Sequence, residues 1–195
     1  MTQKEWDRSD EAQLIAASQR GDHDAFAFLM KLYKDRVFNT ALRFVGNWAI
    51  AEELTQDIFI SVYRNIGGFK GESKFSTWLY RVTVNHAKNR VGYLSRKGYF
   101  RSDELTDNTD GDGSWSLGGR TPSPGEYAQD KELIGILMEC FKKLSDNDRR
   151  IIILKDFEGL NYDEIAEVLS INLGTVKSRL SRARERLKEM MKDYL

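Results

Sequence analysis

Cysteine is almost missing from this sequence, because Cys140 is alone among 195 residues. A lone cysteine excludes an intramolecular disulfide and a metal cluster built on cysteine ligands. Histidine is almost as rare, and His23 and His86 lie far apart and match no metal-ligand spacing. We therefore expect neither a structural metal nor any other cofactor.

Long apolar runs are missing as well. No run approaches the roughly 18 residues that a membrane-spanning helix needs. The N-terminal stretch "MTQKEWDRSDEAQ" has neither the apolar core nor the cleavage site of a signal peptide. The stretch "GGFKGES" is glycine-rich, but it lacks the preceding strand and the GKS/T ending of a phosphate loop. We expect a cytoplasmic protein that does not insert into membranes and is not an enzyme.

Net charge is also lacking, since 30 basic residues balance 30 acidic ones. Along the chain, however, the two signs are segregated. Residues 64–101 carry nine basic residues and one acid, residues 103–126 carry six acids and one arginine, and residues 177–192 carry seven basic residues and two acids. One charged block is typical of a solvated face, but two basic blocks separated by an acidic segment are what binding to a polyanion requires.

Helical periodicity is present nearly everywhere outside one segment, and strand signals are nearly absent. Four helices are expected in the first half: residues 10–20, a long helix from about Phe26 to Gly46, a third from Trp48 to Gly67-Gly68, and a fourth over 76–91. The fourth helix is expected to have Trp78, Leu79, Val82 and His86 on its apolar side.

Residues 101–126 break this pattern, because they are rich in Gly, Ser, Asp and Thr and contain both prolines. They indicate a flexible acidic linker, with a long ordered surface loop as the alternative. Helices resume at about Tyr127, and Ser145 is expected to cap one of them. The sequence therefore predicts an all-α fold with two small helical domains, residues 1–100 and 127–195, joined by the linker.

The second domain contains a helix-turn-helix pattern. Asn161 and Glu164 have the spacing of a capping box and open the short helix "YDEIAEVL". The tight stretch "SINLG" follows, and the last helix then runs nearly to the end of the chain. We expect Ile165 and Leu169 to pack against apolar residues of the last helix and so to fix the angle between the two helices.

The outer face of the last helix combines hydroxyl side chains with long basic ones. The DNA major groove accepts such a helix, because Arg and Lys reach guanine edges or phosphates and Ser and Thr bond to either. The alternatives are a solvated helix of a bundle or a surface for an acidic protein. The predicted DNA-binding residues are Thr175, Lys177, Ser178, Arg179, Ser181, Arg182 and Arg184.

Two long stretches resemble one family. "NYDEIAEVLSINLGTVKSRLSRARERL" closely resembles the C-terminal helix-turn-helix of bacterial extracytoplasmic-function sigma factors, and "AEELTQDIFISVYRNIGGFKGESKFSTWLYRVTVNHAKNR" resembles the other domain of that family. The resemblance implies a protein that binds core RNA polymerase, directs it to promoters and helps to open the duplex. Residues 1–100 would then recognise and melt the −10 element, and residues 127–195 would recognise the −35 element.

Aromatic and basic residues alternate after the third helix, which is the mixture that holds single-stranded DNA. The resemblance implies that the loop "FKGESKF" forms a pocket for a flipped −10 base. Core packing is the favoured role of Trp78, and both roles stay open for Phe75. The residues predicted to act in −10 recognition and melting are Phe69, Lys70, Lys74, Phe75, Ser76, Arg81, Asn85 and Lys88.

By the same resemblance the third helix faces the polymerase, whose expected contacts are the β′ clamp and the β flap. A solvated acidic face is the alternative for this helix. The resemblance also implies an anti-sigma factor as a partner and a linker that runs through the polymerase cleft, although a tether without contacts would suit its composition. The predicted polymerase-binding residues are Glu53, Gln56, Asp57, Phe59, Tyr63 and Arg64.

A helix-turn-helix regulator that binds duplex DNA without polymerase is the competing interpretation. It explains residues 127–195 but leaves the basic and aromatic residues of the first domain without a role. Tight binding to duplex DNA in the absence of polymerase would favour it.

Overall fold

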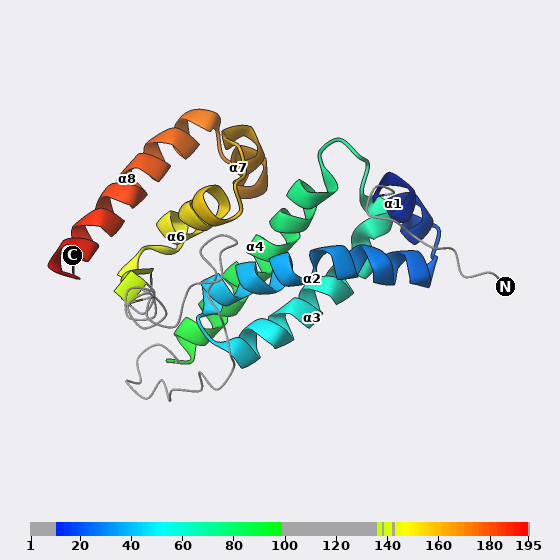
Figure 1. The fold of residues 1–195 in the computed structure, drawn as a ribbon, viewed down its shortest axis with the longest axis horizontal. Coiled ribbons are helices and arrows are strands. Elements are labelled where there is room, and N and C mark those ends of the chain that lie inside the picture. Colours follow the sequence, from blue (N-terminus) through cyan, green and yellow to red (C-terminus); the bar gives the residue numbers. More distant parts are fainter. Residues whose placement is uncertain (1–10, 99–135, 138, 142, 195) are drawn as a thin grey trace, which may run out of the picture. The chain divides into compact units, whose positions relative to one another are not determined.

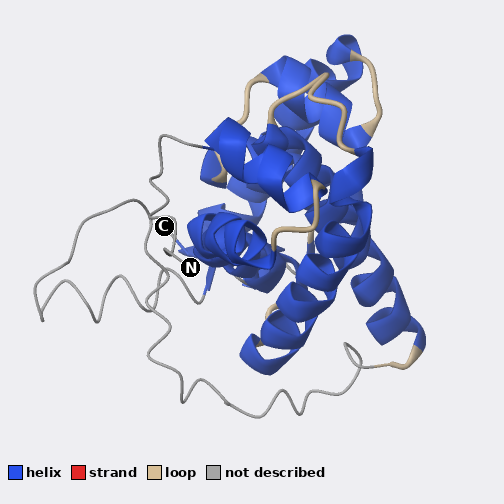
Figure 2. Cartoon of the chain, turned by 90° about the vertical axis from the view of Figure 1, so that its right-hand side faces the viewer, coloured by secondary structure: helices blue, strands red, loops and turns tan. Residues whose placement is uncertain are grey.

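The computed structural model describes residues 11–98, 136–137, 139–141 and 143–194, which form two compact units, Met1–Arg101 and Ser102–Leu195 (Figure 1). Figure 2 shows helices and loops, and no strand, among the described residues. The prediction of two helical domains, the second with a helix-turn-helix, is confirmed. The predicted linker over 101–126 and the helix start near Tyr127 lie outside the described residues.

The first unit packs three long helices against one another. Each of the helices α2, α3 and α4 contacts the other two, and α1 packs on α2 and on the turn η2 (Figure 1). The core between them contains Leu29, Val37, Ile58 and Leu79, each 2% exposed or less. The elements are α1 (Glu11–Gln19), α2 (His23–Val45), α3 (Trp48–Asn65), the 3₁₀ turn η2 (Ile66–Gly68) and α4 (Phe75–Arg96).

Local signals define the ends of these helices. The Asn47 side chain accepts a hydrogen bond from the Ile50 N–H at 3.0 Å and so caps the start of α3. Gly46 ends α2 with φ of 66°, in the left-handed region that glycine adopts at little cost. The predicted ends of the long helix near Gly46 and of the third helix before Gly67-Gly68 are therefore confirmed.

Helix α4 differs from its prediction in length and in buried face. It continues beyond residue 91 to Arg96, because Leu94 extends its buried stripe at 7% exposure. Val82 and His86 are only half-buried, whereas Thr83 is fully buried. The Thr83 hydroxyl donates to the Leu79 carbonyl at 2.9 Å, so this threonine packs in the core without an unpaired hydroxyl.

The second unit contains α6 (Asp146–Ile152), the π-helical turn η3 (Ile153–Phe157), α7 (Tyr162–Leu169), α8 (Leu173–Met191) and the 3₁₀ turn η4 (Lys192–Tyr194). The Ser145 hydroxyl accepts the Asp148 N–H at 3.2 Å, which confirms its predicted capping role. The π turn was not predicted. The run "IIIL" is buried along its whole length, so its hydrophobic pattern has no periodicity that would indicate a π turn.

The helix-turn-helix consists of α7 and α8. The capping box is confirmed: the Glu164 N–H donates to Asn161 Oδ1, and the Asn161 N–H donates to Glu164 Oε2, both at 2.9 Å. Ser170 ends α7 with φ of 54°. Ile165 is buried as expected, but the second buried residue is Val168 and not Leu169, which is half-buried. Positions three apart share the inner face of this short helix, and Leu169 lies at its end.

Candidate functional site

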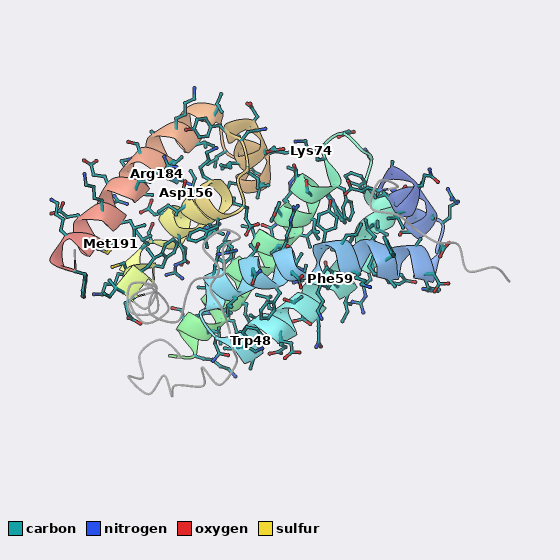
Figure 3. All side chains as sticks on the ribbon, viewed as in Figure 1. Trp48, Phe59, Lys74, Asp156, Arg184 and Met191 are labelled. Carbon is teal, nitrogen blue, oxygen red and sulfur yellow. The ribbon has the colours of Figure 1, made fainter. Side chains whose placement is uncertain are left out.

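The first part of α8 presents polar and basic side chains to solvent. Val176, Leu180 and Ala183 form the buried stripe of the helix. The opposite face is exposed and is visible along α8 in Figure 3. Of the residues predicted to bind DNA, Lys177, Ser178, Ser181, Arg182 and Arg184 are exposed, and Thr175 and Arg179 are half-buried.

Two arginines of α8 are held by carboxylates of the same unit. Arg184 Nε donates to Asp156 Oδ2 at 3.1 Å and Nη2 donates to Oδ1, so the contact is bidentate (Figure 3). This hydrogen bonding raises the pKa of Arg184. Arg186 pairs with Asp148, whose side chain is only 6% exposed.

The cations of α8 therefore fall into two groups. Arg184 and Arg186 tie the helix to α6 and η3. The other cations of the helix form no ion pair with any residue that the structure describes; they are Lys177, Arg179, Arg182 and Lys188. Sequence reasoning missed Asp148 and Asp156, because 38 and 28 residues separate them from their arginines and no local pattern reveals the pairing.

A second candidate surface is the loop between η2 and α4. Lys70 and Lys74 are exposed on this loop, and Lys74 is labelled there in Figure 3. Asn85 and Lys88 are exposed further along α4, whereas Ser76 and Arg81 are half-buried. The loop turns at Gly71, whose φ of 72° favours glycine. The loop exposes these two lysines together with one acid, Glu72.

An aromatic cluster supports this loop. Phe75 lies at its centre, with the rings of Phe69, Trp78 and Tyr33 at centroid distances of 5.5 to 5.6 Å. Phe75 is only 4% exposed, so its ring is not accessible to a base in this structure. Phe69 and Trp78 are half-buried, and the packing of Trp78 favours its core role. Burial, together with a hydrogen bond to Glu11, raises the pKa of the Tyr33 hydroxyl far above its usual range.

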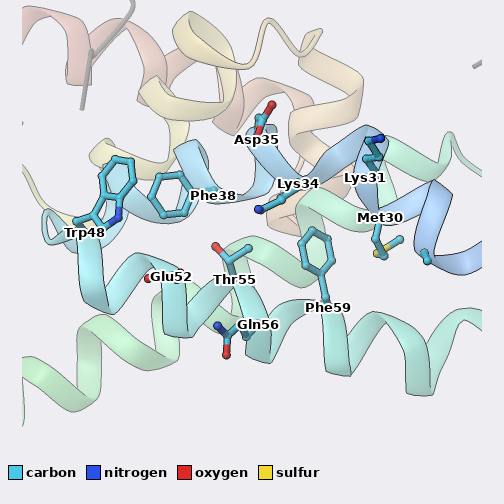
Figure 4. A pocket seen from close by; sticks show the side chains of 11 residues that line it. Met30, Lys31, Lys34, Asp35, Phe38, Trp48, Glu52, Thr55, Gln56 and Phe59 are labelled. Carbon is cyan, nitrogen blue, oxygen red and sulfur yellow. The ribbon is translucent and has the colours of Figure 1, made fainter. Parts of the chain in front are cut away.

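A third candidate surface is a groove between α2 and α3, with a volume of about 640 Å³ (Figure 4). Phe38, Trp48 and Phe59 form apolar parts of its wall, and Lys34 and Glu52 contribute charges. The Trp48 ring is 43% exposed and packs edge-on against Phe38 at 4.6 Å. Sequence reasoning missed Trp48 and the whole α2 wall, because the pairing of α2 with α3 is a tertiary contact.

The residues predicted to bind polymerase lie on two sides of α3. Gln56 and Phe59 line the groove. On the same side Tyr63 packs against Phe26 at 4.9 Å, and its hydroxyl lies 3.2 Å from His23 Nδ1. Glu53 forms an ion pair with Arg90 of α4. The remaining two predicted residues, Asp57 and Arg64, are exposed.

Neither a metal site nor a membrane span is found in the described parts of the chain. Among those residues no group of three or more His, Cys, Asp or Glu side chains could hold a metal ion. No helix formed by them has the length and the apolar character needed to cross a bilayer.

Comparisons with known proteins agree with one another over most of the chain. The family model of sigma-70 region 2 matches residues 29–97, and that of sigma-70 region 4 matches residues 134–187. The RNA polymerase sigma-H factor of Pseudomonas aeruginosa is 33% identical over 192 residues, which cover 96% of this chain and 97% of that protein. The ECF RNA polymerase sigma factor SigW of Bacillus subtilis is 35% identical over 180 residues, which cover 92% of this chain and 95% of SigW.

Solved structures show the same fold. The sigma factor RpoE of Bartonella quintana, in complex with the anti-sigma factor NepR, is 25% identical and superimposes with a TM-score of 0.62, covering 86% of this chain and 96% of RpoE. CnrH, in complex with the cytosolic domain of CnrY, is 20% identical and has a TM-score of 0.69, covering 95% of this chain and 99% of CnrH.

Proposed function

The chain belongs to the extracytoplasmic-function family of RNA polymerase sigma factors, and we propose that its two helical units divide promoter recognition between them. One observation carries the proposal. The two units contain the segments matched to regions 2 and 4, in that order, and each presents exposed basic side chains on the surface expected to meet DNA. On this proposal the protein is an initiation factor that acts through polymerase and is not an enzyme.

The second unit recognises the −35 element through α8. A helix of this kind enters the major groove, where hydroxyl and basic side chains contact base edges and phosphates. Arg182 is exposed, and among the residues that the structure describes its side chain donates only from Nε to the Ser178 carbonyl at 3.2 Å, which leaves its terminal nitrogens for a base or a phosphate on this proposal. Arg184 mainly anchors the helix through Asp156, and Thr175, Lys177, Ser178, Arg179 and Ser181 complete the contact surface.

The first unit captures and melts the −10 element at the loop and along α4. Lys70, Lys74 and Lys88 follow the phosphate backbone, and Asn85 hydrogen-bonds a base edge. Phe69 borders the pocket for the flipped base. Phe75 supports this pocket from the core and does not contact DNA, because its ring is covered. Ser76 and Arg81 complete the set from the first turns of α4.

The groove between α2 and α3 binds the β′ clamp of core polymerase, and the second unit contacts the β flap. An amphipathic helix of the partner fits an apolar groove with charged edges. Gln56 and Phe59 contact it there, and Asp57, Tyr63 and Arg64 extend the surface along α3. RpoE was solved with an anti-sigma factor bound, and we propose that an anti-sigma factor also holds this chain inactive.

Co-purification with core RNA polymerase tests the proposal, followed by run-off transcription from a genomic DNA library. We expect a stable complex and new transcripts whose upstream regions share two sequence elements. A chain that binds duplex DNA tightly but does not associate with polymerase would instead be a helix-turn-helix regulator.

A further inference from the structure

We propose that α1 positions the loop of residues 69–74 and that Gln19 determines where this loop begins. The inference rests on the proposed −10 role of the loop and adds a residue that does not contact DNA. Helix α1 precedes residues 29–97, the segment matched to region 2, so this contribution comes from outside that segment.

Gln19 makes two hydrogen bonds across the turn that precedes the loop. Its Nε2 donates to the Ile66 carbonyl at 3.0 Å and to the Phe69 carbonyl at 2.7 Å. A glutamine amide has two N–H donors, so both are engaged by this one turn. Ile66 begins η2 and Phe69 follows its last residue, and the contact therefore fixes the point at which the chain leaves η2.

Packing also holds the two ends of this turn, because Ile66 is 3% exposed and the Phe69 ring lies 5.5 Å from that of Phe75, whereas the two glycines between them have no side chain to pack. Gly67 and Gly68 are exposed, and apart from the adjacent backbone no heavy atom of the described residues lies within 4 Å of where a Cβ would stand on either residue. Within the turn itself the Phe69 N–H donates to the Ile66 carbonyl at 3.0 Å. Two consecutive glycines leave the backbone unusually free, so the loss of Gln19 should let Phe69 and the start of the loop move.

The far end of the loop is tied to α1 by a different route. The Tyr33 hydroxyl donates to Glu11 of α1, and the Tyr33 ring packs edge-on against Phe75 at 5.5 Å. Phe75 is the first residue of α4, where the loop ends. Both ends of the loop are thus connected to α1, while Lys70 and Lys74 remain exposed between them.

This arrangement makes Gln19 a positioning residue. Capture of a flipped base depends on the shape of its pocket, whereas phosphate contacts of flexible lysines tolerate small displacements. A change at Gln19 should therefore reduce discrimination between an intact base and a missing one more than it reduces total affinity for DNA.

Substitution at two glutamines of α1 provides a matched test. Gln19→Leu removes both donors at similar size. Gln13→Leu makes the same change at an exposed residue of α1 that has no hydrogen bond to any described residue. The probe is a single-stranded oligonucleotide copied from the −10 region of a promoter mapped by run-off transcription, with and without one abasic site at each position. The complex of the full chain with core polymerase is titrated with each strand. The measured quantity is its affinity for the intact strand divided by its affinity for the abasic strand.

We expect the wild-type complex to have one position at which the abasic site strongly weakens binding. Gln19→Leu should lower that ratio by about fivefold to tenfold, the lower end of the range for two hydrogen bonds, because Gln19 is exposed to solvent. Gln13→Leu should leave it unchanged. Gln19→Lys, which keeps N–H donors, should retain most of the discrimination. Gln19→Glu, which replaces donors by acceptors, should lose it and serves as the test if the leucine variant does not fold.

An unchanged ratio in the Gln19 variants would overturn the positioning role. An equal loss of affinity for intact and abasic strands, or a loss of polymerase binding, would also overturn it, because Gln19 would then be a general stability residue. A wild-type ratio near one at every position would overturn the −10 role of the loop itself, and the inference with it.

Discussion

Replacing Arg182 or Arg184 by alanine should separate DNA contact from helix anchoring, because the two arginines lie two positions apart on α8 and have different partners. The terminal nitrogens of Arg182 have no hydrogen-bond partner among the described residues, whereas Arg184 forms a bidentate pair with Asp156. We expect Arg182→Ala to weaken −35 recognition and Arg184→Ala to lower the free energy of unfolding.

The sizes of the two effects follow from exposure. The side chains of Arg184 and Asp156 are 50% and 32% exposed. Solvent screening at such exposure limits the pair to about 0.5–1 kcal/mol of stability. A base contact by Arg182 contributes about 1–3 kcal/mol of discrimination, and an exposed side chain far from the core changes stability by less than about 0.5 kcal/mol.

Two assays distinguish these effects. Urea unfolding of the full chain gives the change in the free energy of unfolding. Asp156→Ala should lower this free energy by as much as Arg184→Ala does. The double variant should be no less stable than either single variant, because both changes remove the same pair. High salt should shrink this loss, since it screens the pair. Competition between promoter fragments with intact and scrambled −35 elements gives the recognition change for the variant complexed with core polymerase.

Three results would contradict this reasoning. Arg184→Ala could impair −35 discrimination more than Arg182→Ala, which would make Arg184 a base contact. Arg182→Ala could reduce affinity equally for intact and scrambled elements, which would make Arg182 a phosphate contact. Additive losses in the Asp156 and Arg184 double variant would show that the pair contributes no coupling energy.

Three further substitutions test other parts of the structure. Asn161→Ala removes the capping box and should cost about 1 kcal/mol in thermal or urea unfolding, with polymerase binding unchanged. Phe59→Ala should weaken co-purification with core polymerase by about tenfold or more if the α2–α3 groove is a binding site, and an unaffected complex would exclude that role. The pKa of Tyr33 is raised above its ordinary value of 10.0. Its contribution to stability is therefore fully present below the ordinary pKa, and it is lost as the pH rises toward the raised pKa. Tyr33→Phe should therefore reduce the loss of stability measured between about pH 9 and pH 11, and an unchanged slope would contradict the role of burial and Glu11.

Features encoded within a few residues could be predicted from the sequence. The Asn161–Glu164 capping box and the Ser145 cap depend on contacts three residues apart, and Gly46 ends its helix by its own backbone freedom. The resemblance of two long stretches to one family supplied the order of the two domains. Local chemistry and family resemblance therefore predicted most of the fold.

Tertiary contacts explain what sequence reasoning missed. Periodicity placed Leu169 on the inner face of α7, but Val168 is buried there and Leu169 lies at the helix end. The apolar side predicted for the fourth helix did not include Thr83, although the Thr83 hydroxyl bonds to the preceding turn and the residue is fully buried. The Gln19 contact spans 47 and 50 residues, and no pattern within one helix indicates it.

The division of the cations on α8 has a consequence for engineering. Arg184 and Arg186 hold the helix in place from its middle, and the residues that face outward before them, such as Lys177, Ser178 and Ser181, have no part in those ion pairs. On the proposed −35 role of α8, a library that varies only these outward positions should change promoter preference while retaining the framework that orients the helix. Such a library would test the chain as a scaffold for orthogonal transcription, in which one synthetic factor activates its own promoters and does not recognise those of the host.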